Sequence, residues 1–388
     1  MTTYLYAKHT YLGHTVTGPG YLAIDEGKFG YWQTDKPQSG EIIDYGEASL
    51  APGLVDTHVH GFGGYDFMDG TTEAVQHISQ GLLKAGVTSF LATTLTASPE
   101  QLLAACQAIA ATADDLTGAR LEGIFLEGPY FTEAHKGAQN PAYLLDPDLE
   151  QFKAWQEASG GRVRKIALAP ERAGALDFIQ AMHEQGVVVG LAHTDASYET
   201  CCSAVNAGAD LFIHIYNGMR GLHHREPGVV GAALTLPDVY AELICDGHHV
   251  HPAAARLAIQ SRGSEGTVLI TDCMRGGGLP EGPSRLGELD VMIKDGAARL
   301  VDGGSLAGSV LNLNQAIKHV IDWQIATPEE AIRMASTTPA ESVHLGACCG
   351  QIAPGRRADV VVLDSNFDVL ATYVEGECRY HREGEADG

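Results

Sequence analysis

Long hydrophobic runs are missing from this sequence of 388 residues. No segment approaches the about eighteen consecutive apolar residues that a membrane-spanning helix needs. The N-terminal stretch MTTYLYAKHTYLGHT also lacks the basic start, apolar core and small-residue cleavage site of a secretory leader. We therefore expect a cytoplasmic protein that has no membrane partner.

Positive charge is scarce. The chain has 25 Lys and Arg residues against 49 Asp and Glu residues, which gives a formal net charge of −24. Such a surface repels nucleic acid and anionic lipid, so we expect no nucleic-acid partner. If the substrate is itself an anion, specific Arg, His or backbone N–H groups must reverse this field locally.

Cysteine occurs eight times, but never with C-x-x-C spacing. Two adjacent pairs, Cys201-Cys202 and Cys348-Cys349, are the only close neighbours. In a chain of this length, the pattern indicates reduced and mostly packed thiols rather than a disulfide framework. A reducing compartment agrees with the expected cytoplasmic location.

Short β-like segments broken by glycine turns make up residues 1–52, and the same character returns in residues 347–388. We predict that the two ends together form one small β-sandwich domain. Residues 53–346 lie between them and have a different pattern, so we expect them to form a separate, larger domain.

The middle of the chain alternates eight short apolar runs with segments of helical spacing. Near-continuous apolar strands separated by helices predict a parallel sheet covered by helices, and eight of them predict an α/β fold with a closed (β/α)8, TIM-like barrel. A hairpin that turns at Asp295-Gly296 and two further helical segments, 309–325 and 328–338, are expected after the eighth run. The eight runs are residues 54–61, 88–95, 121–128, 164–171, 187–194, 211–218, 241–248 and 267–274.

All these runs except the second end in polar residues. Because the carboxyl ends of the strands of such a barrel meet at one mouth, we expect these side chains to converge there. His58 and His60 share one face of a strand, and the glycines after them would let backbone and substrate approach closely. The polar strand-end residues are His58, His60, Glu127, Glu171, His193, His214, Asn217, Asp246, His248, His249 and Asp272.

Imidazoles grouped with carboxylates are the ligands that zinc, iron and similar divalent ions prefer. A single histidine at a strand end is more often a packing residue, and an H-x-H pair alone is a weak signal. Glu171 could equally cap the following helix. The prediction of a metal site therefore depends on the whole constellation, five candidate ligands from four strands with Asp272 on a fifth.

Several longer segments resemble those of the amidohydrolase superfamily and, within it, the N-acetylglucosamine-6-phosphate deacetylases, in the same order along essentially the whole chain. The combination of LEGP, HIYNGM and REPG is much more specific than the H-x-H pair. The segments are PGLVDTHVHG, LEGPYFTEAHKGAQNP, LAHTDASYE, FIHIYNGMRGLHHREPGVVGAAL, ICDGHHV, LITDCM and LAGS.

This resemblance implies metal-dependent hydrolysis of the acetamide of N-acetyl-D-glucosamine 6-phosphate to D-glucosamine 6-phosphate and acetate, a reaction of amino-sugar catabolism. It implies that Glu127, His193 and His214 are metal ligands and that Asp272 is the catalytic acid/base. Some members of the family have lost the two histidines of the first strand. Since this chain retains His58 and His60, the resemblance allows a second ion bridged by Glu127, so one or two ions per subunit, with zinc or iron expected.

The resemblance also implies a small-molecule sugar-phosphate partner. Arg225 and His249 are the cationic groups that a phosphate would need in so acidic a protein. In the family this arginine can reach the neighbouring subunit's site, which implies a homodimer. Some members have a histidine that polarises the amide carbonyl where this chain has Gln139, whose amide N–H can donate a hydrogen bond but carries no positive charge. The implied substrate-binding residues are Ala138, Gln139, Asn217, Gly218, Arg225, Asp246, His248, His249, Leu306, Ala307 and Gly308.

Two alternatives remain at this point. Another amidohydrolase, such as a D-aminoacylase or a cyclic-amide hydrolase, would share the barrel and the ligands but would not need Arg225 and His249. A non-catalytic barrel that binds a sugar phosphate would not need a buried acid such as Asp272 beside a metal.

Overall fold

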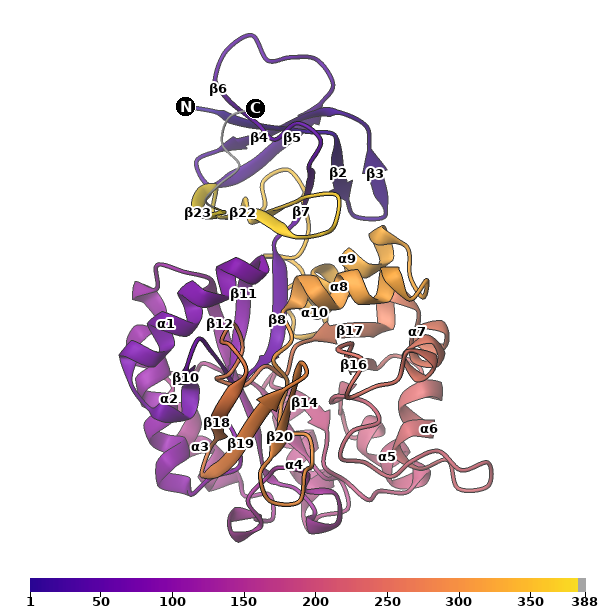
Figure 1. Cartoon of the computed structure of the whole chain (residues 1–388). Coiled ribbons are helices and arrows are strands. Elements are labelled where there is room, and N and C mark those ends of the chain that lie inside the picture. The colour runs from indigo at the N-terminus through magenta and orange to yellow at the C-terminus, as the bar shows by residue number, and fades with distance from the viewer. Residues whose placement is uncertain (383–388) are drawn as a thin grey trace.

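The computed structural model describes residues 1–382, in which a helix-covered barrel lies beside sheets formed from both ends of the chain (Figure 1). The barrel is an eight-stranded parallel sheet with the strand order β17-β16-β15-β14-β13-β12-β11-β8. Each predicted apolar run overlaps one of these strands, which confirms the predicted α/β barrel fold. The strands are β8 (Leu54–Val59), β11 (Val87–Thr93), β12 (Arg120–Tyr130), β13 (Val163–Leu168), β14 (Val188–Leu191), β15 (Leu211–Phe212), β16 (Tyr240–Ile244) and β17 (Thr267–Ile270).

At the seam between β8 and β17, backbone hydrogen bonds among residues 1–382 join β8 to the chain after β17 only at the carboxyl end of the barrel. The Asp272 N–H donates to the His58 carbonyl at 2.9 Å, and the His60 N–H donates to the Cys273 carbonyl at 2.8 Å. A single parallel bridge, Val59 to Cys273, also crosses the seam. The barrel is therefore nearly closed, and it closes at the residues that carry the candidate ligands.

The barrel strands are apolar along their whole length because both of their faces are covered. All residues of β8 and β11 are buried. Successive residues of one strand belong to different apolar clusters: Phe90 packs in the cluster that contains the helical residue Ile109, whereas Leu91 packs in the cluster that contains Phe125. One set of side chains faces the helices and the other faces inward, as the period of two of a strand requires.

Ten α-helices are present among residues 1–382, and several begin at strong capping residues. Ser98 caps the second helix in a capping box with Gln101, and Pro99 occupies its first position. None of the helices in this part of the chain is long and apolar enough to cross a membrane. The helices are α1 (Thr72–Leu82), α2 (Pro99–Thr112), α3 (Leu149–Ala158), α4 (Ala175–Glu184), α5 (Tyr198–Asn206), α6 (Gly228–Thr235), α7 (Pro252–Gly266), α8 (Leu313–Asp322), α9 (Pro328–Ala335) and α10 (Thr337–Ser342), with short 3-10 turns η1 (Phe67–Asp69), η2 (Leu83–Ala85), η3 (Ala113–Asp115), η4 (Glu133–His135) and η5 (Pro141–Tyr143).

The last predicted helical segment, 328–338, differs from the structure in one respect. It splits into α9 and α10 at Ser336, whose φ of −136° is not helical. The Ser336 hydroxyl donates to the Ile332 carbonyl at 2.7 Å and closes the end of α9. The helical pattern of the sequence continues across this residue, so it did not reveal the break.

Both ends of the chain contribute to one six-stranded sheet with the order β23-β22-β21-β7-β2-β3, and a four-stranded sheet, β5-β4-β1-β6, packs beside it. The contribution of both termini is confirmed, because β7 pairs with β2 and also with β21. The strands are β1 (Thr3–Ala7), β2 (His9–Leu12), β3 (Thr15–Thr17), β4 (Gly20–Asp25), β5 (Lys28–Gln33), β6 (Glu41–Asp44), β7 (Ser49–Pro52), β21 (Val360–Leu363), β22 (Val369–Val374) and β23 (Glu377–His381).

Strand β8 connects these sheets to the barrel. In Figure 1 it leaves the terminal sheets and runs into the barrel, so its carboxyl end lies away from them. Since β7 ends at Pro52 and β8 begins at Leu54, we propose to keep residues 1–52, 53–346 and 347–388 as the limits of the two domains.

Two small sheets lie near the candidate site. The predicted hairpin at Asp295-Gly296 is confirmed, with β19 (Leu289–Lys294) and β20 (Ala297–Leu300) on its two sides, and β18 (Gly282–Leu286) adds a third strand. Directly after His60, β9 (Gly61–Phe62) and β10 (Tyr65–Asp66) form a second hairpin. A Cβ on Gly61 would lie 2.2 Å from the Tyr65 carbonyl oxygen, so this glycine allows the backbone of the hairpin to close.

Candidate metal centre and active site

Six buried side chains from five strand ends form two adjoining groups of metal-ligand type. One group is His58, His60 and Asp272, and the other is Glu127, His193 and His214. Within each group the candidate ligand atoms all lie within 4.8 Å of one another. The structure therefore brings together all six residues that the sequence analysis placed at the metal and catalytic centre.

Glu127 stands between the two groups and faces all four imidazoles. Its Oε1 lies 3.1 Å from His214 Nε2 and 3.5 Å from the Nε2 atoms of both His193 and His58. Its Oε2 lies 3.4 Å from His60 Nε2. Burial would raise the pKa of this carboxyl, but the close contacts with the four histidines lower that pKa well below its usual value.

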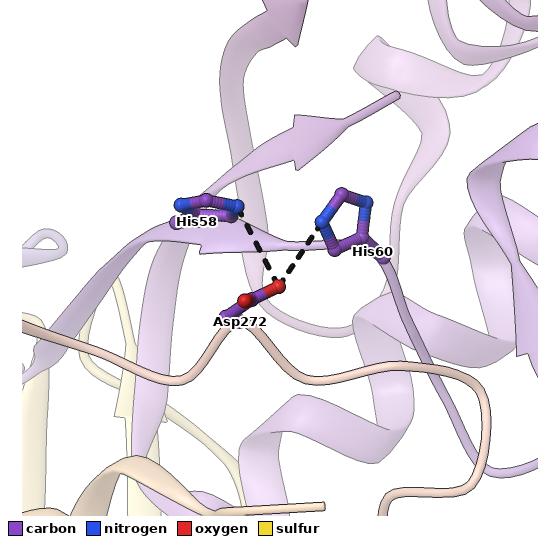
Figure 2. A group of neighbouring side chains, drawn as sticks. All are labelled: His58, His60 and Asp272. Atoms are coloured by element: carbon purple, nitrogen blue, oxygen red, sulfur yellow. Dashed lines mark ion pairs between the residues drawn. The ribbon is translucent and has the colours of Figure 1, made fainter. Parts of the chain in front are cut away.

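Asp272 follows β17, the last barrel strand, and joins His58 and His60 from the first. Figure 2 shows one carboxylate oxygen pointing between the two imidazoles, 3.2 Å from His60 Nε2 and 3.6 Å from His58 Nε2. Burial would raise the pKa of Asp272, but the charge of His58 and the contacts with His60 lower it. Burial opposes protonation of His58, yet the charge of Asp272 and the neighbouring carboxylates of Glu127 and Glu242 raise the pKa of His58 to about 9.

The residues of this centre suit a divalent cation. His58 Nε2 is buried without a hydrogen-bond partner among the described residues, although it points towards two carboxylates. Four imidazoles and two carboxylates in a space of a few ångströms form a nitrogen and oxygen donor set, which zinc and iron accept.

A cavity of about 580 Å³ opens onto the two groups. It contains seven of the eleven predicted substrate-binding residues, and Leu95 and Leu286 add apolar surface from β11's end and from β18. The lining residues are His60, Leu95, Glu127, Gly137, Ala138, Gln139, His193, His214, Asn217, Gly218, His249, Asp272, Leu286, Leu306 and Gly308.

Residues 49–379 match the amidohydrolase family. The chain belongs to this family.

Individual relatives show which members of the amidohydrolase family this chain resembles. The N-acetylglucosamine-6-phosphate deacetylase of Vibrio furnissii is 43% identical over 343 residues, which cover 88% of this chain and 86% of that protein. The corresponding Bacillus subtilis enzyme is 35% identical, with 93% of each chain covered. The N-acetylgalactosamine-6-phosphate deacetylase of Escherichia coli O157:H7 is 41% identical and covers 84% of this chain and 87% of its own.

A solved structure agrees with these relatives. It is an Asp-to-Ala variant of the Mycobacterium smegmatis N-acetyl-D-glucosamine-6-phosphate deacetylase in complex with N-acetyl-D-glucosamine-6-phosphate. The two structures superimpose with a TM-score of 0.93 at 33% sequence identity, and the match covers 97% of this chain and 99% of that chain. The resemblance that the sequence motifs indicated is therefore confirmed.

Three of the six central residues of this amidohydrolase have a backbone conformation that L-residues rarely adopt. The φ angles of His193, His214 and Asp272 are 44°, 32° and 48°. Each follows the end of its barrel strand, so the positive φ turns the chain there and aims the side chain at the centre. Such conformations cost of the order of 1–3 kcal/mol each and are typical of functional sites.

Gln139 is buried in the cavity wall with both ends of its amide engaged. Its Nε2 donates to Glu127 Oε2 at 2.9 Å, and its Oε1 accepts from the Thr96 N–H at 3.0 Å. The amide N–H that the sequence analysis considered for polarising a substrate carbonyl is thus directed at Glu127.

Four predicted substrate-binding residues of the described chain lie outside the cavity lining: Arg225, Asp246, His248 and Ala307. Asp246 contacts its neighbours: its carboxylate lies 2.6 Å from His249 Nδ1 and accepts the His248 N–H at 2.8 Å. Ala307 is fully buried beside Leu306. Arg225 is exposed, and its guanidinium lies 2.8 Å from His224 Nε2.

Glu171 does not lie at the cavity. Its carboxylate accepts the Thr194 hydroxyl at 2.5 Å and the Asp195 N–H at 2.7 Å, so it fixes the turn after His193. The sequence analysis left this residue open between a supporting role and a helix cap, and the contacts place it behind the His193 turn.

Sequence reasoning missed the His135 carbonyl and Glu242, which contact two of the imidazoles on the side away from the cavity, and it missed Lys165, which contacts Glu242. His193 Nδ1 lies 2.9 Å from the His135 carbonyl oxygen. His58 Nδ1 lies 3.0 Å from Glu242 Oε2, and Glu242 is also bonded to Lys165. A lysine and a glutamate inside the apolar runs RKIALAPE and AELICDGH were the available signal, because charged side chains are costly inside a barrel unless they have partners.

Proposed function

We propose that this amidohydrolase hydrolyses the acetamide of N-acetyl-D-glucosamine 6-phosphate and releases D-glucosamine 6-phosphate and acetate, as in amino-sugar catabolism. The observation that carries the proposal is the position of Asp272 and Glu127. Glu127 faces all four imidazoles and Asp272 faces two of them, His58 and His60, and both carboxylates line one cavity. The Vibrio furnissii deacetylase, 43% identical along most of the chain, supports the choice of substrate.

We propose that the two groups of ligands hold one or two divalent ions per subunit, with zinc or iron suited to the donor set. His58, His60 and Asp272 would hold one, and Glu127, His193 and His214 the other, with Glu127 placed to bridge them. A divalent ion in such a position polarises a carbonyl and lowers the pKa of water.

Asp272 is the group we assign to proton transfer. Its pKa is lowered, so it is ionised at neutral pH and can act as a base. Its side chain is 12% exposed and reaches the cavity, where it would accept a proton from the attacking water. It would then return this proton to the amine nitrogen as the C–N bond breaks.

Because the protein has a large net negative charge, a bound phosphate needs cationic or N–H groups close to it. His249 reaches the cavity on one side, with its imidazole fixed by Asp246, and Asn217 and Gly218 line the wall nearby. Arg225 is exposed on the loop before α6. We propose that it reaches the phosphate site of a second copy in a homodimer, because a cation placed there serves no contact with the cavity of its own chain.

A second hexosamine phosphate is also supported by the comparisons. The Escherichia coli O157:H7 relative that acts on N-acetylgalactosamine 6-phosphate is nearly as similar as the Vibrio furnissii relative, 41% against 43% identical. We therefore propose the C4 epimer as an alternative substrate of the same site. The cytoplasmic location belongs to the same proposal and is supported by eight free cysteines.

Acetate release from purified protein tests the proposal. The substrates are N-acetylglucosamine 6-phosphate, its galactosamine epimer, unphosphorylated N-acetylglucosamine, an N-acetyl-D-amino acid and a cyclic amide. We expect turnover of a hexosamine phosphate that a chelator abolishes and added Zn²⁺ restores. Faster turnover of the amino acid or the cyclic amide would assign a different amidohydrolase activity, and no turnover of any amide would favour a binding protein.

A further inference from the structure

Beneath the candidate metal ligands, a lysine and a glutamate are buried inside the barrel. Lys165 on β13, Glu242 on β16 and His58 on β8 are all fully inaccessible to solvent. They come from three strands that are not neighbours in the sheet, so their side chains meet across the barrel interior. The proposed reaction gives Lys165 and Glu242 no direct part.

The contacts of these residues form a chain that ends at a metal-ligand candidate. Glu242 uses Oε1 to accept from the Lys165 ammonium and Oε2 to contact His58 Nδ1 at 3.0 Å. Lys165 also donates to the Thr57 carbonyl at 3.2 Å, and its Nζ lies 3.9 Å from the centre of the Phe125 ring. That ring in turn packs edge-on against the His58 imidazole, with 4.9 Å between ring centres.

The contacts of Glu242 determine that Nδ1 of His58 carries a proton. An ionised carboxylate only accepts hydrogen bonds, and Glu242 already accepts one from the Lys165 ammonium. The short contact with Glu242 therefore requires the proton on His58 Nδ1. The other nitrogen, Nε2, is then the one directed at Glu127 and Asp272.

Among the four imidazoles, His58 is held in a distinct way. His193 donates to a neutral backbone carbonyl, whereas His58 contacts a carboxylate. The Nδ1 atoms of His60 and His214 have no hydrogen-bond partner in the part of the chain that the structure describes. A carboxylate behind a ligating histidine fixes the ring and makes it a stronger ligand.

A contribution to the stability of the fold does not by itself explain why this ion pair is buried. Desolvation of two charges commonly exceeds their attraction, and apolar residues of similar volume are often as stable or more so. Lys165 and Glu242 pair where Glu242 also contacts a candidate ligand, His58.

We propose that Glu242, itself held by Lys165, is a positioning residue that presents His58 Nε2 to a divalent ion and thereby sets the occupancy of the group His58, His60 and Asp272. The proposal rests on the metal dependence in the proposed function, but it concerns one of the two groups only. The group of Glu127, His193 and His214 should not depend on Glu242.

Metal titration of a charge-balanced variant tests the proposal. The double variant Glu242→Leu/Lys165→Met replaces the pair by apolar side chains, so that neither member of the pair is left buried without the other. We expect Zn²⁺ affinity at the His58 group to fall about 10–100-fold, the usual effect of removing such a partner. Competition with a chelating dye and metal analysis after gel filtration measure affinity and stoichiometry without substrate.

Two further variants make the result specific. Glu242→Gln/Lys165→Met restores an acceptor for His58 Nδ1 and should recover most of the lost affinity. The matched control is Glu122→Leu/Arg357→Met, an ion pair at the opposite end of β12 from Glu127, and it should bind Zn²⁺ as the wild type does. His58→Ala identifies which titration step belongs to this group.

Unchanged Zn²⁺ binding in the Leu/Met variant would overturn the proposal, as would an equal loss in the matched control. If the Leu/Met variant does not fold, ¹⁵N-histidine spectra of the Zn²⁺-loaded wild type decide: His58 should carry its proton on Nδ1, and coordination through Nδ1 would overturn the proposal. Because none of these measurements uses an amide substrate, a wrong assignment of the reaction would show only in the acetate assay.

Discussion

Replacement of Asp272 by asparagine removes the proposed proton-transfer group with little change of shape. Asparagine has nearly the same volume and tolerates the left-handed backbone, with φ of 48°, better than most residues do. It can also still contact His60, which lies 3.2 Å from the carboxylate. The variant should therefore fold, and its defect should be chemical.

The expected loss follows from the role of the carboxylate. An uncharged amide at this position cannot take a proton from water or return it to the departing amine. Loss of such a group costs about 10²–10⁴ in rate. At 1.36 kcal/mol for each factor of ten, the barrier rises by about 2.7–5.4 kcal/mol. The loss should appear in kcat, with a much smaller change in KM, because the interaction is made in the transition state.

The assay is acetate release from N-acetylglucosamine 6-phosphate, with the metal content of each preparation measured in parallel. Asp359→Asn is the matched control, since Asp359 is a buried aspartate directly before β21 in the terminal sheets, where it accepts the Glu375 N–H at 2.9 Å. Near-normal turnover of Asp272→Asn at full metal content would refute the assignment. If turnover and metal content fall together, excess Zn²⁺ separates the two effects: recovery with metal would show that Asp272 acts as a ligand only.

Three other predictions address neighbouring groups. Gln139→Leu leaves the Thr96 N–H without its acceptor and should cost about 1–3 kcal/mol in urea denaturation, whereas an unchanged midpoint would contradict the observed contacts. Arg225→Ala should raise KM for the phosphorylated sugar but not for N-acetylglucosamine, and equal effects on both sugars in a steady-state assay would exclude a phosphate contact. Removal of metal should lower the melting temperature in calorimetry, because an ion that binds only the folded chain stabilises it, and identical melting curves with and without chelator would contradict this.

The barrel and its centre were predictable because they follow from local rules. Apolar runs with the length of strands, separated by helical spacing, specify a parallel sheet, and the carboxyl ends of such strands meet at one mouth. His58, His193 and His214 therefore converge although they are distant in sequence. Strand length was less predictable: β15 has only two residues, Leu211–Phe212, because the chain turns at His214 with a positive φ.

The residues behind the centre could not be placed from the sequence. Side chains alternate between the two faces of a strand, so Lys165 and Glu242 could be expected to point into the barrel. This alternation does not show which inward side chains from distant strands will be in contact. That depends on the stagger of the strands and on their packing. Arg225 shows the opposite case, in which resemblance to a family implied a role and only the structure showed that the side chain lies outside the cavity of its own chain.

The seam of the barrel and the candidate metal centre are built from the same residues. In the described chain, β8 and β17 form no regular ladder, and their carboxyl ends are joined by backbone bonds at His58, His60, Asp272 and Cys273. Three of these four residues also form one of the two ligand groups. An ion held by that group would tie the first strand to the last across the seam. Closure of the barrel brings its ligands together, and the ion would in turn oppose opening, so the folding of the barrel and the assembly of this half of the site are coupled.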